Sequence, residues 1–234
     1  MVSLPLRLQK VADLIPTMQT VADIGTDHAL LPIYLVQSGR SQKVIAVDVN
    51  RGPYETARGR VKALGLEDRI DVRLGDGTAV LRPHEASVLV AAGIGGRSLV
   101  GIFERDCGVI NTLNYLVLNP MTHLQLVRKW LIENGWLFVD EDLVFEQGRY
   151  YQVIAAKPGT NQDKFLTPLE LQIGPVLLKK RHPLLKEYLA SLLKRYSRAV
   201  NSMKRSSDQD VHDKVKRLNN LMEAIDSFLN AYTE

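Results

Sequence analysis

The segment Asp23-Ile24-Gly25-Thr26-Asp27 combines two carboxylates with a glycine turn, directly after a short apolar stretch. A small residue at such a turn lets a ligand approach the backbone and directs it to the N-terminus of the next helix. The G-x-G-x-x-G cradle that holds a dinucleotide pyrophosphate is absent at this turn. The turn therefore favours a nucleoside cofactor without phosphates, S-adenosyl-L-methionine, over a nicotinamide dinucleotide.

Two further acidic positions follow apolar stretches in the same way. Asp48, with Val49 after it, closes the second stretch about twenty residues beyond the glycine turn, where a carboxylate can accept hydrogen bonds from two ribose hydroxyls. Acidic residues also end strands without any such role. Gly75-Asp76-Gly77 can bring backbone N–H groups and a carboxylate to an adenine edge, and the alternative is a tight turn with a solvated Asp76.

Small residues and one amide end two later stretches. The segment 91–96 contains Ala92, Gly93, Gly95 and Gly96, and it either packs closely or lets a flat substrate lie against the backbone. We favour the second interpretation at this edge of the sheet. Asn119 is both a donor and an acceptor, which suits an adenine edge as well as a capping turn.

Hydrolytic and metal-dependent chemistry is not indicated. His28 stands alone at the start of a predicted helix, where it is either structural or a cofactor contact. The sequence has no His, Asp and Glu spacing typical of metal ligands and no G-x-S-x-G nucleophile elbow. We therefore expect no metal site and no hydrolase.

Strand-like and helix-like segments alternate through the first 159 residues. Near-continuous apolar strands separated by helices predict a parallel sheet covered on both faces, with ligands beyond the carboxyl ends of the strands. A final hairpin would add an antiparallel strand at the edge. The expected strands are 20–25, 44–48, 70–74, 87–91 and 115–118, the helices are 28–38, 53–65, 122–134 and one after residue 96, and the hairpin is 136–145 with 149–157.

The pattern lapses between Pro158 and Pro168 into a polar stretch, which we interpret as the boundary between domains 1–159 and 160–234. Two helices with heptad stripes are expected beyond it, joined by a turn at 206–208 into an antiparallel hairpin. The apolar positions of the two stripes are Leu185, Leu189, Leu192, Tyr196, Ala199 and Met203, then Val211, Val215, Leu218, Met222, Ile225, Leu229 and Tyr232.

The net charge of +4 is confined to this helical region. Residues 1–159 contain 17 Lys and Arg against 17 Asp and Glu, whereas residues 160–234 contain 13 against 9. Between residues 179 and 205 there are nine basic residues, Lys194, Arg195 and Arg198 among them, and one acidic residue, Glu187. Such a run is either a solvated helix face or a surface for phosphate backbone.

The overall composition is that of an ordinary globular protein, with 45% hydrophobic and 24% charged residues. No apolar run approaches the ~20 residues that cross a bilayer, and the first ten residues lack a signal sequence. Cys107 is the single cysteine, so an internal disulfide is excluded. We expect a soluble, cytoplasmic protein without membrane association.

Several of these segments resemble one family when they are taken together. Segments 23–32 (DIGTDHALLP), Gly52-Pro53, 75–77 (GDG) and 92–96 (AGIGG) are similar in order and position to those of the bacterial tRNA adenine-22 N1-methyltransferases. Arg7-Leu8 and the segment 118–120 (LNP) also match the family's arrangement. The sequence departs from the family pattern at Leu30, Asp48, Ile94, Asn119 and Met121.

The resemblance implies a Rossmann-like class I methyltransferase sheet, α/β in class, with a C-terminal helical coiled-coil hairpin. It also implies S-adenosyl-L-methionine as cofactor and tRNA as substrate. Domain 1–159 would bind the cofactor and domain 160–234 would contact the tRNA. We expect a monomer.

The residues expected to act fall into three groups. Asp27 would stabilise the positive charge that develops on the adenine, and Asn119 would position the base. The cofactor would be bound by Asp23, Gly25, Thr26, Asp27, His28, Asp48, Val49, Asp76, Gly77, Ala92 and Gly93. The substrate would be bound by Arg7, Gly95, Gly96, Lys194, Arg195 and Arg198.

Other functions remain open at this point. A methyltransferase of the same fold could act on another RNA site, a small molecule or a protein, and it would not need the basic hairpin for the latter two. A non-enzymatic RNA-binding module could retain the cofactor fold. A dehydrogenase ranks last, because the pyrophosphate cradle is missing.

Overall fold

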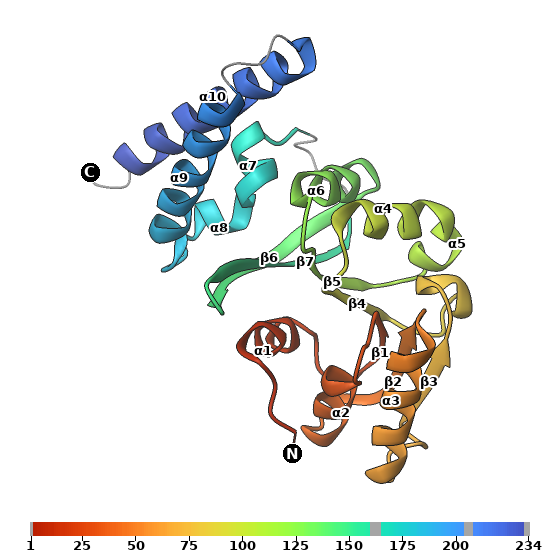
Figure 1. Cartoon of the computed structure of the whole chain (residues 1–234). Coiled ribbons are helices and arrows are strands. Elements are labelled where there is room, and N and C mark those ends of the chain that lie inside the picture. The colour runs from red at the N-terminus through yellow and green to blue at the C-terminus, as the bar shows by residue number, and fades with distance from the viewer. Residues whose placement is uncertain (1, 160–164, 204–207, 232–234) are drawn as a thin grey trace. The chain divides into compact units, whose positions relative to one another are not determined.

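The computed structural model describes residues 2–159, 165–203 and 208–231, and the chain divides into two compact units, Met1–Phe165 and Leu166–Glu234. The first unit is built on one seven-stranded sheet in the order β3-β2-β1-β4-β5-β7-β6 (Figure 1). The strands are β1 (Gln19–Ile24), β2 (Ser41–Asp48), β3 (Ile70–Leu74), β4 (Val88–Ala92), β5 (Tyr115–Asn119), β6 (Trp136–Glu146) and β7 (Arg149–Pro158). The helices of this unit are α1 (Leu6–Asp13), α2 (Leu30–Gln37), α3 (Arg51–Ala63), α4 (Gly96–Arg105), α5 (Cys107–Ile110) and α6 (Leu124–Glu133), with a 3-10 turn over Gly77–Val80.

The sheet has the predicted class and direction. β3, β2, β1, β4 and β5 run parallel, and β7 joins β5 antiparallel with β6 at the edge. β2 begins at Ser41, three residues earlier than predicted, because the polar residues Ser41 and Lys43 already pair with β1. Ser41 also donates its hydroxyl to the carbonyl of Gln19 at 2.6 Å. The predicted parallel sheet with an antiparallel hairpin is therefore confirmed.

Three helices begin at different residues from those predicted. α2 begins at Leu30 and not at His28, because Asp27 and Ala29 have φ values of +53° and +54°, which a right-handed helix excludes. α6 begins at Leu124 for the same reason, since His123 has a φ of +52°. α3 begins at Arg51, and Pro53 is accommodated within its first turn, where no N–H donor is needed.

Apolar residues of β1, β2, β4 and β5 alternate between two cores, one on either face of the sheet. Ala22 and Ile24 of β1 pack in the cluster under α4 and α6, with Phe103 and Trp130. Val21 of the same strand packs in the cluster under α1, α2 and α3. The same grouping of helices on the two faces is visible in Figure 1. The near-continuous apolar strands follow from burial on both faces.

α1 was not predicted from the sequence. Only Val11 and Ala12 are buried among its eight residues, so its amphipathic pattern is short. The helix packs on the β6–β7 hairpin, where Lys10 pairs with Asp142 at 3.1 Å. It places Arg7 close to the ends of the strands.

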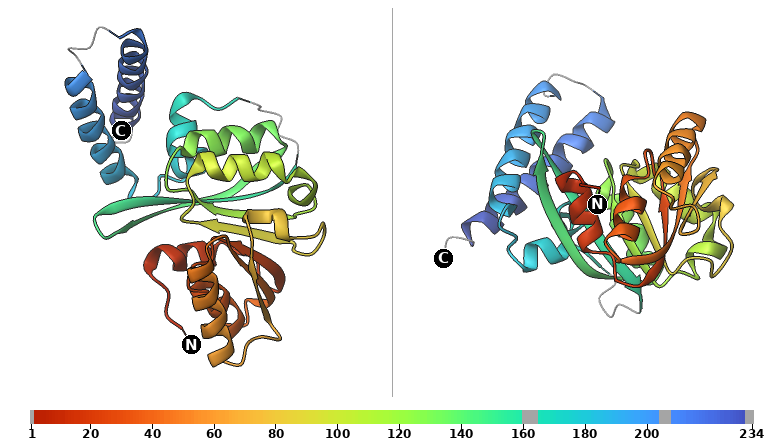
Figure 2. Two further views of the ribbon diagram at one scale, coloured as in Figure 1. Left: turned by 45° about the vertical axis from the view of Figure 1, so that its right-hand side comes forward. Right: turned by 90° about the horizontal axis from the view of Figure 1, so that it is seen from below.

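The β6–β7 hairpin is the longest pair of strands in the sheet, as the left view of Figure 2 shows. Its turn is Gln147-Gly148, where both φ values are positive, as a two-residue hairpin turn requires. Arg128 of α6 donates to Glu141 of β6 at 2.8 Å, and both side chains are fully buried. This ion pair ties the hairpin to the helix layer.

The second unit is helical, and α9 and α10 pack along each other as the predicted hairpin (Figure 2). Leu185, Leu189, Leu192 and Tyr196 of the predicted stripe are buried in α9, and Ile225 is buried in α10. Asp208 caps α10 by accepting the N–H of Asp210 at 2.9 Å. The helices of this unit are α7 (Pro168–Ile173), α8 (Pro175–Lys179), α9 (Leu185–Met203) and α10 (Gln209–Asn230).

α7 and α8 were not predicted, because each is short and lies in a proline-containing stretch. Thr167 begins α7 with a capping box, in which its hydroxyl accepts the N–H of Glu170. The first unit ends at Phe165 and the second begins at Leu166, within the polar stretch from Pro158 to Pro168 that contains the predicted boundary 159/160. The predicted polar linker 160–163, the turn residues Ser206 and Ser207, and Tyr232 lie outside the described residues. No helix in the described ranges could cross a membrane.

Candidate functional site

The β1–α2 turn is held tightly against the end of β2. Gly25 and Thr26 donate their N–H groups to the carbonyl of Val47, at 2.9 and 3.0 Å. Gly25 has a φ of +74°, and a Cβ at this position would lie 3.3 Å from Cδ1 of Ile94. A side chain at residue 25 would therefore strain the turn and crowd the loop after β4.

The Asp48 side chain holds this turn in place through hydrogen bonds from backbone N–H groups. Its side chain is buried, and its two carboxylate oxygens accept the N–H groups of Asp27, at 3.0 Å, and Asn50, at 2.9 Å. Each carboxylate oxygen has a further lone pair for a ligand hydroxyl. The same carboxylate that holds the β1–α2 turn is therefore the one expected to accept the ribose hydroxyls of the cofactor.

The environment of the Asp23 side chain changes its pKa. Its carboxylate is buried and accepts the Thr26 hydroxyl at 2.7 Å. Burial raises the pKa of Asp23 to about 6, opposed by the Thr26 hydrogen bond and supported by the negative charge of Asp48. The charge of Asp23 consequently changes close to neutral pH.

We expect the affinity for a cationic cofactor to depend on this charge. Asp23 becomes ionised as the pH rises through about 6, so binding of S-adenosyl-L-methionine should strengthen between pH 5 and pH 7. The dissociation constant should rise by up to about tenfold per pH unit below 6. Calorimetric titration at several pH values measures this change, and Asp23→Asn should flatten the profile. A profile that keeps its slope in Asp23→Asn would assign the titration to another group.

A cavity of about 230 Å³ lies directly against the turn. It brings together eight of the predicted site residues from α1, the β1–α2 turn and the end of β4. Leu8, Leu30 and Leu31 also line it and were not predicted as site residues, although they lie within the segments that carry the family resemblance. The predicted residues at the cavity are Arg7, Asp23, Gly25, Thr26, Asp27, His28, Ala92 and Gly93.

Asp27 presents its side chain at this cavity. The carboxylate is 68% exposed and lies 3.6 Å from Nε2 of His28. Arg60 of α3 donates to the backbone carbonyl of His28 at 3.2 Å. The Asp27 backbone N–H is bonded to Asp48, so its main chain is fixed while its carboxylate remains accessible.

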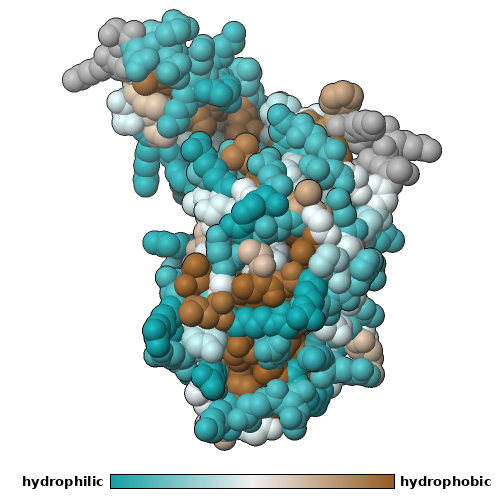
Figure 3. Space-filling model, turned by 90° about the vertical axis from the view of Figure 1, so that its right-hand side faces the viewer, coloured by the Kyte–Doolittle hydropathy of each residue, from teal (hydrophilic) through white to brown (hydrophobic). Residues whose placement is uncertain are grey.

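Four of the predicted cofactor residues do not line this cavity in the described structure, namely Asp48, Val49, Asp76 and Gly77. Val49 follows Asp48 and is 59% exposed, and Leu74, which pairs with Asp48 in register, is 47% exposed. Figure 3 faces the side of β3, α3 and α5 and shows apolar surface between hydrophilic residues there.

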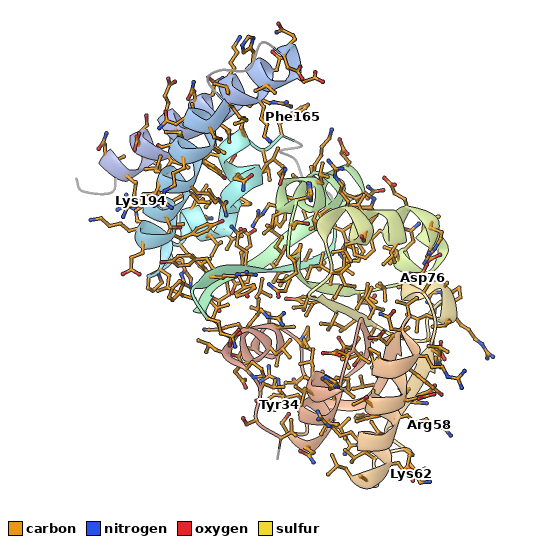
Figure 4. The ribbon with its side chains drawn as sticks, viewed as in Figure 1. Tyr34, Arg58, Lys62, Asp76, Phe165 and Lys194 are labelled. Carbon is orange, nitrogen blue, oxygen red and sulfur yellow. The ribbon has the colours of Figure 1, made fainter. Side chains whose placement is uncertain are left out.

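Asp76 lies at the end of β3 (Figure 4), beside Gly77, whose φ of +59° begins the 3-10 turn. Its carboxylate is paired with the guanidinium of Arg105, which also donates to the Asp76 carbonyl at 2.8 Å. Arg105 therefore orients Asp76, and the predicted contacts of Asp76 and Gly77 with the cofactor stay predictions.

Gly96 is buried and packs against the loop after β5. Its N–H donates to the carbonyl of Thr122 at 3.0 Å, and a Cβ would lie only 2.4 Å from the same oxygen. Gly95 is half-buried, and a Cβ at this residue would lie 3.4 Å from Oγ1 of Thr122. Close backbone packing therefore accounts for Gly96, and the substrate contacts of Gly95 and Gly96 stay predictions.

Asn119 ends β5 and is fully buried. Its Oδ1 accepts from Nη1 of Arg7 at 2.8 Å, and its Nδ2 donates to the carbonyl of Gln152 at 2.7 Å. Both ends of the amide are thus engaged within the protein. The predicted direct contact of Asn119 with the target base stays a prediction.

Lys194, Arg195 and Arg198 are all exposed on α9 of the second unit, and Figure 4 labels Lys194. The guanidinium of Arg195 lies 5.4 Å from the ring centroid of Tyr196. Lys204 and Arg205 of the same basic run lie outside the described residues. Among the described side chains, no three His, Cys, Asp or Glu residues are grouped to hold a metal ion, and the expected lack of a metal stays a prediction.

Comparison with known proteins extends over nearly the whole chain. Residues 21–227 match the TrmK family model, tRNA (adenine(22)-N(1))-methyltransferase. A Bacillus subtilis (strain 168) protein with the same name is 30% identical over 223 residues, which cover 94% of each chain.

Two solved structures share the fold of the whole chain. The crystal structure of the B. subtilis m1A22 tRNA methyltransferase TrmK has a TM-score of 0.87 and 29% identity, covering 97% of this chain and 99% of that chain. A Streptococcus pneumoniae putative tRNA (m1A22) methyltransferase in complex with S-adenosyl-L-methionine has a TM-score of 0.81 and 30% identity, covering 95% of this chain and 100% of that chain. The resemblance seen in the sequence motifs is thereby confirmed: this chain belongs to the TrmK family of tRNA (adenine(22)-N(1))-methyltransferases.

Proposed function

We propose that the protein transfers the methyl group of S-adenosyl-L-methionine to N1 of adenine 22 in tRNA. The observation that carries the proposal is the carboxylate-lined cavity at the β1–α2 turn, in a chain that matches the TrmK family from residue 21 to residue 227. A methyltransferase that acts on another RNA site remains the second candidate. A tRNA substrate also supports a cytoplasmic location.

The residues at the cavity suit a cationic nucleoside cofactor. Asp23 and Asp27 supply negative charge, Leu30 and Leu31 supply apolar surface, and the turn approaches the cavity through the backbone of Gly25. Asp48 would accept the ribose hydroxyls, and Val49 with Asp76 would contact the adenine. S-adenosyl-L-methionine supplies an electrophilic methyl group on a sulfonium when it is bound at such a site.

Methylation of adenine N1 needs little proton transfer from the protein. N1 of neutral adenine already carries an exposed lone pair, so no strong base must act before attack. The main contribution of the chain is to hold the reacting atoms in line, which can supply several kcal/mol of the barrier. Asp27 would stabilise the positive charge that the adenine gains. The target base must be unpaired or flipped to reach the cavity.

The basic surface of α9 would hold the tRNA through its phosphates. We expect that changing Lys194, Arg195 and Arg198 to Glu raises the KM for tRNA about tenfold or more and leaves the affinity for S-adenosyl-L-methionine unchanged. A matched control changes Lys214, Lys216 and Arg217 of α10 to Glu, where Asp210 and Asp213 lie nearby in the sequence. Equal effects in the two triple variants, or tRNA binding without salt dependence, would contradict a specific role for α9.

One assay tests the reaction itself. The full chain is incubated with S-adenosyl-L-methionine labelled in the methyl group and with total bacterial tRNA, which is then digested to nucleosides. We expect label in 1-methyladenosine. Label in a different nucleoside would favour another RNA site, and binding of tRNA without any label would favour an RNA-binding module.

A further inference from the structure

Asn119 and Arg7 form a hydrogen-bonded pair at the edge of the cavity. Asn119 is 0% exposed, with its amide oxygen on Arg7 and its amide nitrogen on the Gln152 carbonyl. Among the described residues, Arg7 lines the cavity and Asn119 does not. The Asn119 amide keeps one further N–H and one further lone pair, but the side chain is fully buried and is not among the residues that line the cavity. Its contact with the site therefore passes through Arg7.

Arg7 is fixed by three elements of the sheet. Nη1 donates to Asn119 of β5 at 2.8 Å, and the guanidinium lies 5.5 Å from the ring centroid of Tyr151 of β7. The backbone N–H of Arg7 donates to Glu146 of β6 at 3.2 Å. A guanidinium carries five N–H donors, so most of them remain available for a ligand. These anchors leave a cation of defined orientation at the cavity edge.

The positive charge of Arg7 indicates which chemical group of the RNA its guanidinium would bind. The sulfonium of the cofactor and the methylated adenine are cationic, so a second cation is unsuited to the reacting atoms, and the anions it could meet are the cofactor's carboxylate and a phosphodiester of the RNA. A phosphodiester is anionic and accepts two parallel hydrogen bonds from a guanidinium. A nucleotide that is flipped into the cavity must leave its phosphates at the rim.

We propose that Arg7 binds the phosphodiester beside the target adenine, and that Asn119 is the positioning residue that holds Arg7 in place. This inference rests on the proposed methylation of tRNA. It replaces the direct contact of Asn119 with the base by an indirect role. It also explains why Arg7, on the first helix, is brought to the end of β5.

The test is a double-mutant cycle on tRNA methylation by the full chain. Arg7→Ala and Asn119→Ala should each raise the KM for tRNA roughly tenfold or more, while kcat falls less than about threefold. The double variant should lose no more than about twofold beyond Arg7→Ala, because Asn119 acts through the residue already removed. Asn119→Asp keeps the acceptor for Arg7 but loses the donor to the Gln152 carbonyl, so it should reverse only part of the rise in KM seen in Asn119→Ala.

Three controls keep the outcome decisive. Thermal unfolding reports whether each variant is folded, and Arg51→Ala changes an exposed arginine that pairs with Glu55 of its own helix. Calorimetry with S-adenosylhomocysteine is the third control, because a loss of affinity in folded Arg7→Ala would assign Arg7 to the cofactor's carboxylate. If Asn119→Ala does not fold, an unchanged KM in Arg7→Ala alone overturns the proposal. Independent, multiplicative losses in the two single variants, or a fall in kcat in Asn119→Ala that Arg7→Ala does not share, would instead assign Asn119 to the base. If the unmodified chain does not methylate tRNA at all, the proposed function has failed, which is a separate result.

Discussion

Replacing Asp27 with asparagine is expected to lower kcat for tRNA methylation about 100-fold or more, with a comparatively small loss of cofactor affinity. The positive charge moves from the sulfonium to the adenine ring during the reaction, and Asp27 is the accessible carboxylate at the cavity. Asparagine keeps a side chain of similar size and tolerates the left-handed conformation of residue 27, where φ is +53°. The loss would therefore report the missing charge and not a distorted turn.

Single-turnover methylation with saturating cofactor measures this effect. Asp27→Ala should show at least the same loss, with an added cost from the strained backbone. Asp68→Asn is a matched control, because Asp68 is an exposed acidic residue of the same unit outside the cavity. Turnover within about twofold of the unmodified chain in Asp27→Asn would remove Asp27 from the mechanism.

Asp48→Ala is expected to weaken cofactor binding about 100-fold, because hydrogen bonds to a buried carboxylate are among the strongest that a ligand hydroxyl makes. The substitution removes the acceptor for the ribose hydroxyls. It also leaves the N–H groups of Asp27 and Asn50 without the acceptor that now holds them. Both the ligand contact and the shape of the turn would be lost.

Calorimetry with S-adenosylhomocysteine measures the change without interference from turnover. Asp48→Asn separates the two causes, because its amide oxygen can still accept one backbone N–H group. We expect its affinity to lie between those of the unmodified chain and Asp48→Ala. Affinity that is unchanged in both variants would show that the ribose is bound elsewhere.

The elements that bury apolar residues on regular periods were predictable from the sequence. β1 and β5 were predicted within one residue, because Val, Ile and Leu fill both faces of these parallel strands. β3 was predicted at its observed bounds, and its apolar residues alternate with Asp71 and Arg73. The heptad stripes predicted α9 and α10 for the corresponding reason. α1, α7 and α8 were missed, because helices of five to eight residues show too few turns for a clear period.

Part of the candidate site was also predictable from the sequence, and part was not. Its backbone turn was predictable, because Gly25 and the flanking acidic residues are adjacent in the sequence. The partners of Asn119 were not, since Arg7 lies 112 residues away and Gln152 lies 33 residues away along the chain. The buried pair of Arg128 and Glu141 was missed for the same reason: a charge is paired inside a protein by tertiary structure, which no local pattern records.

The most direct test of the central claim is a crystal structure of this chain with S-adenosylhomocysteine. We predict that the nucleoside lies against Gly25, with its ribose hydroxyls within hydrogen-bonding distance of the Asp48 carboxylate and its amino acid portion directed toward Asp23 and Asp27. A ligand bound away from the β1–α2 turn, or a dinucleotide that binds the turn in preference to S-adenosylhomocysteine, would contradict this account.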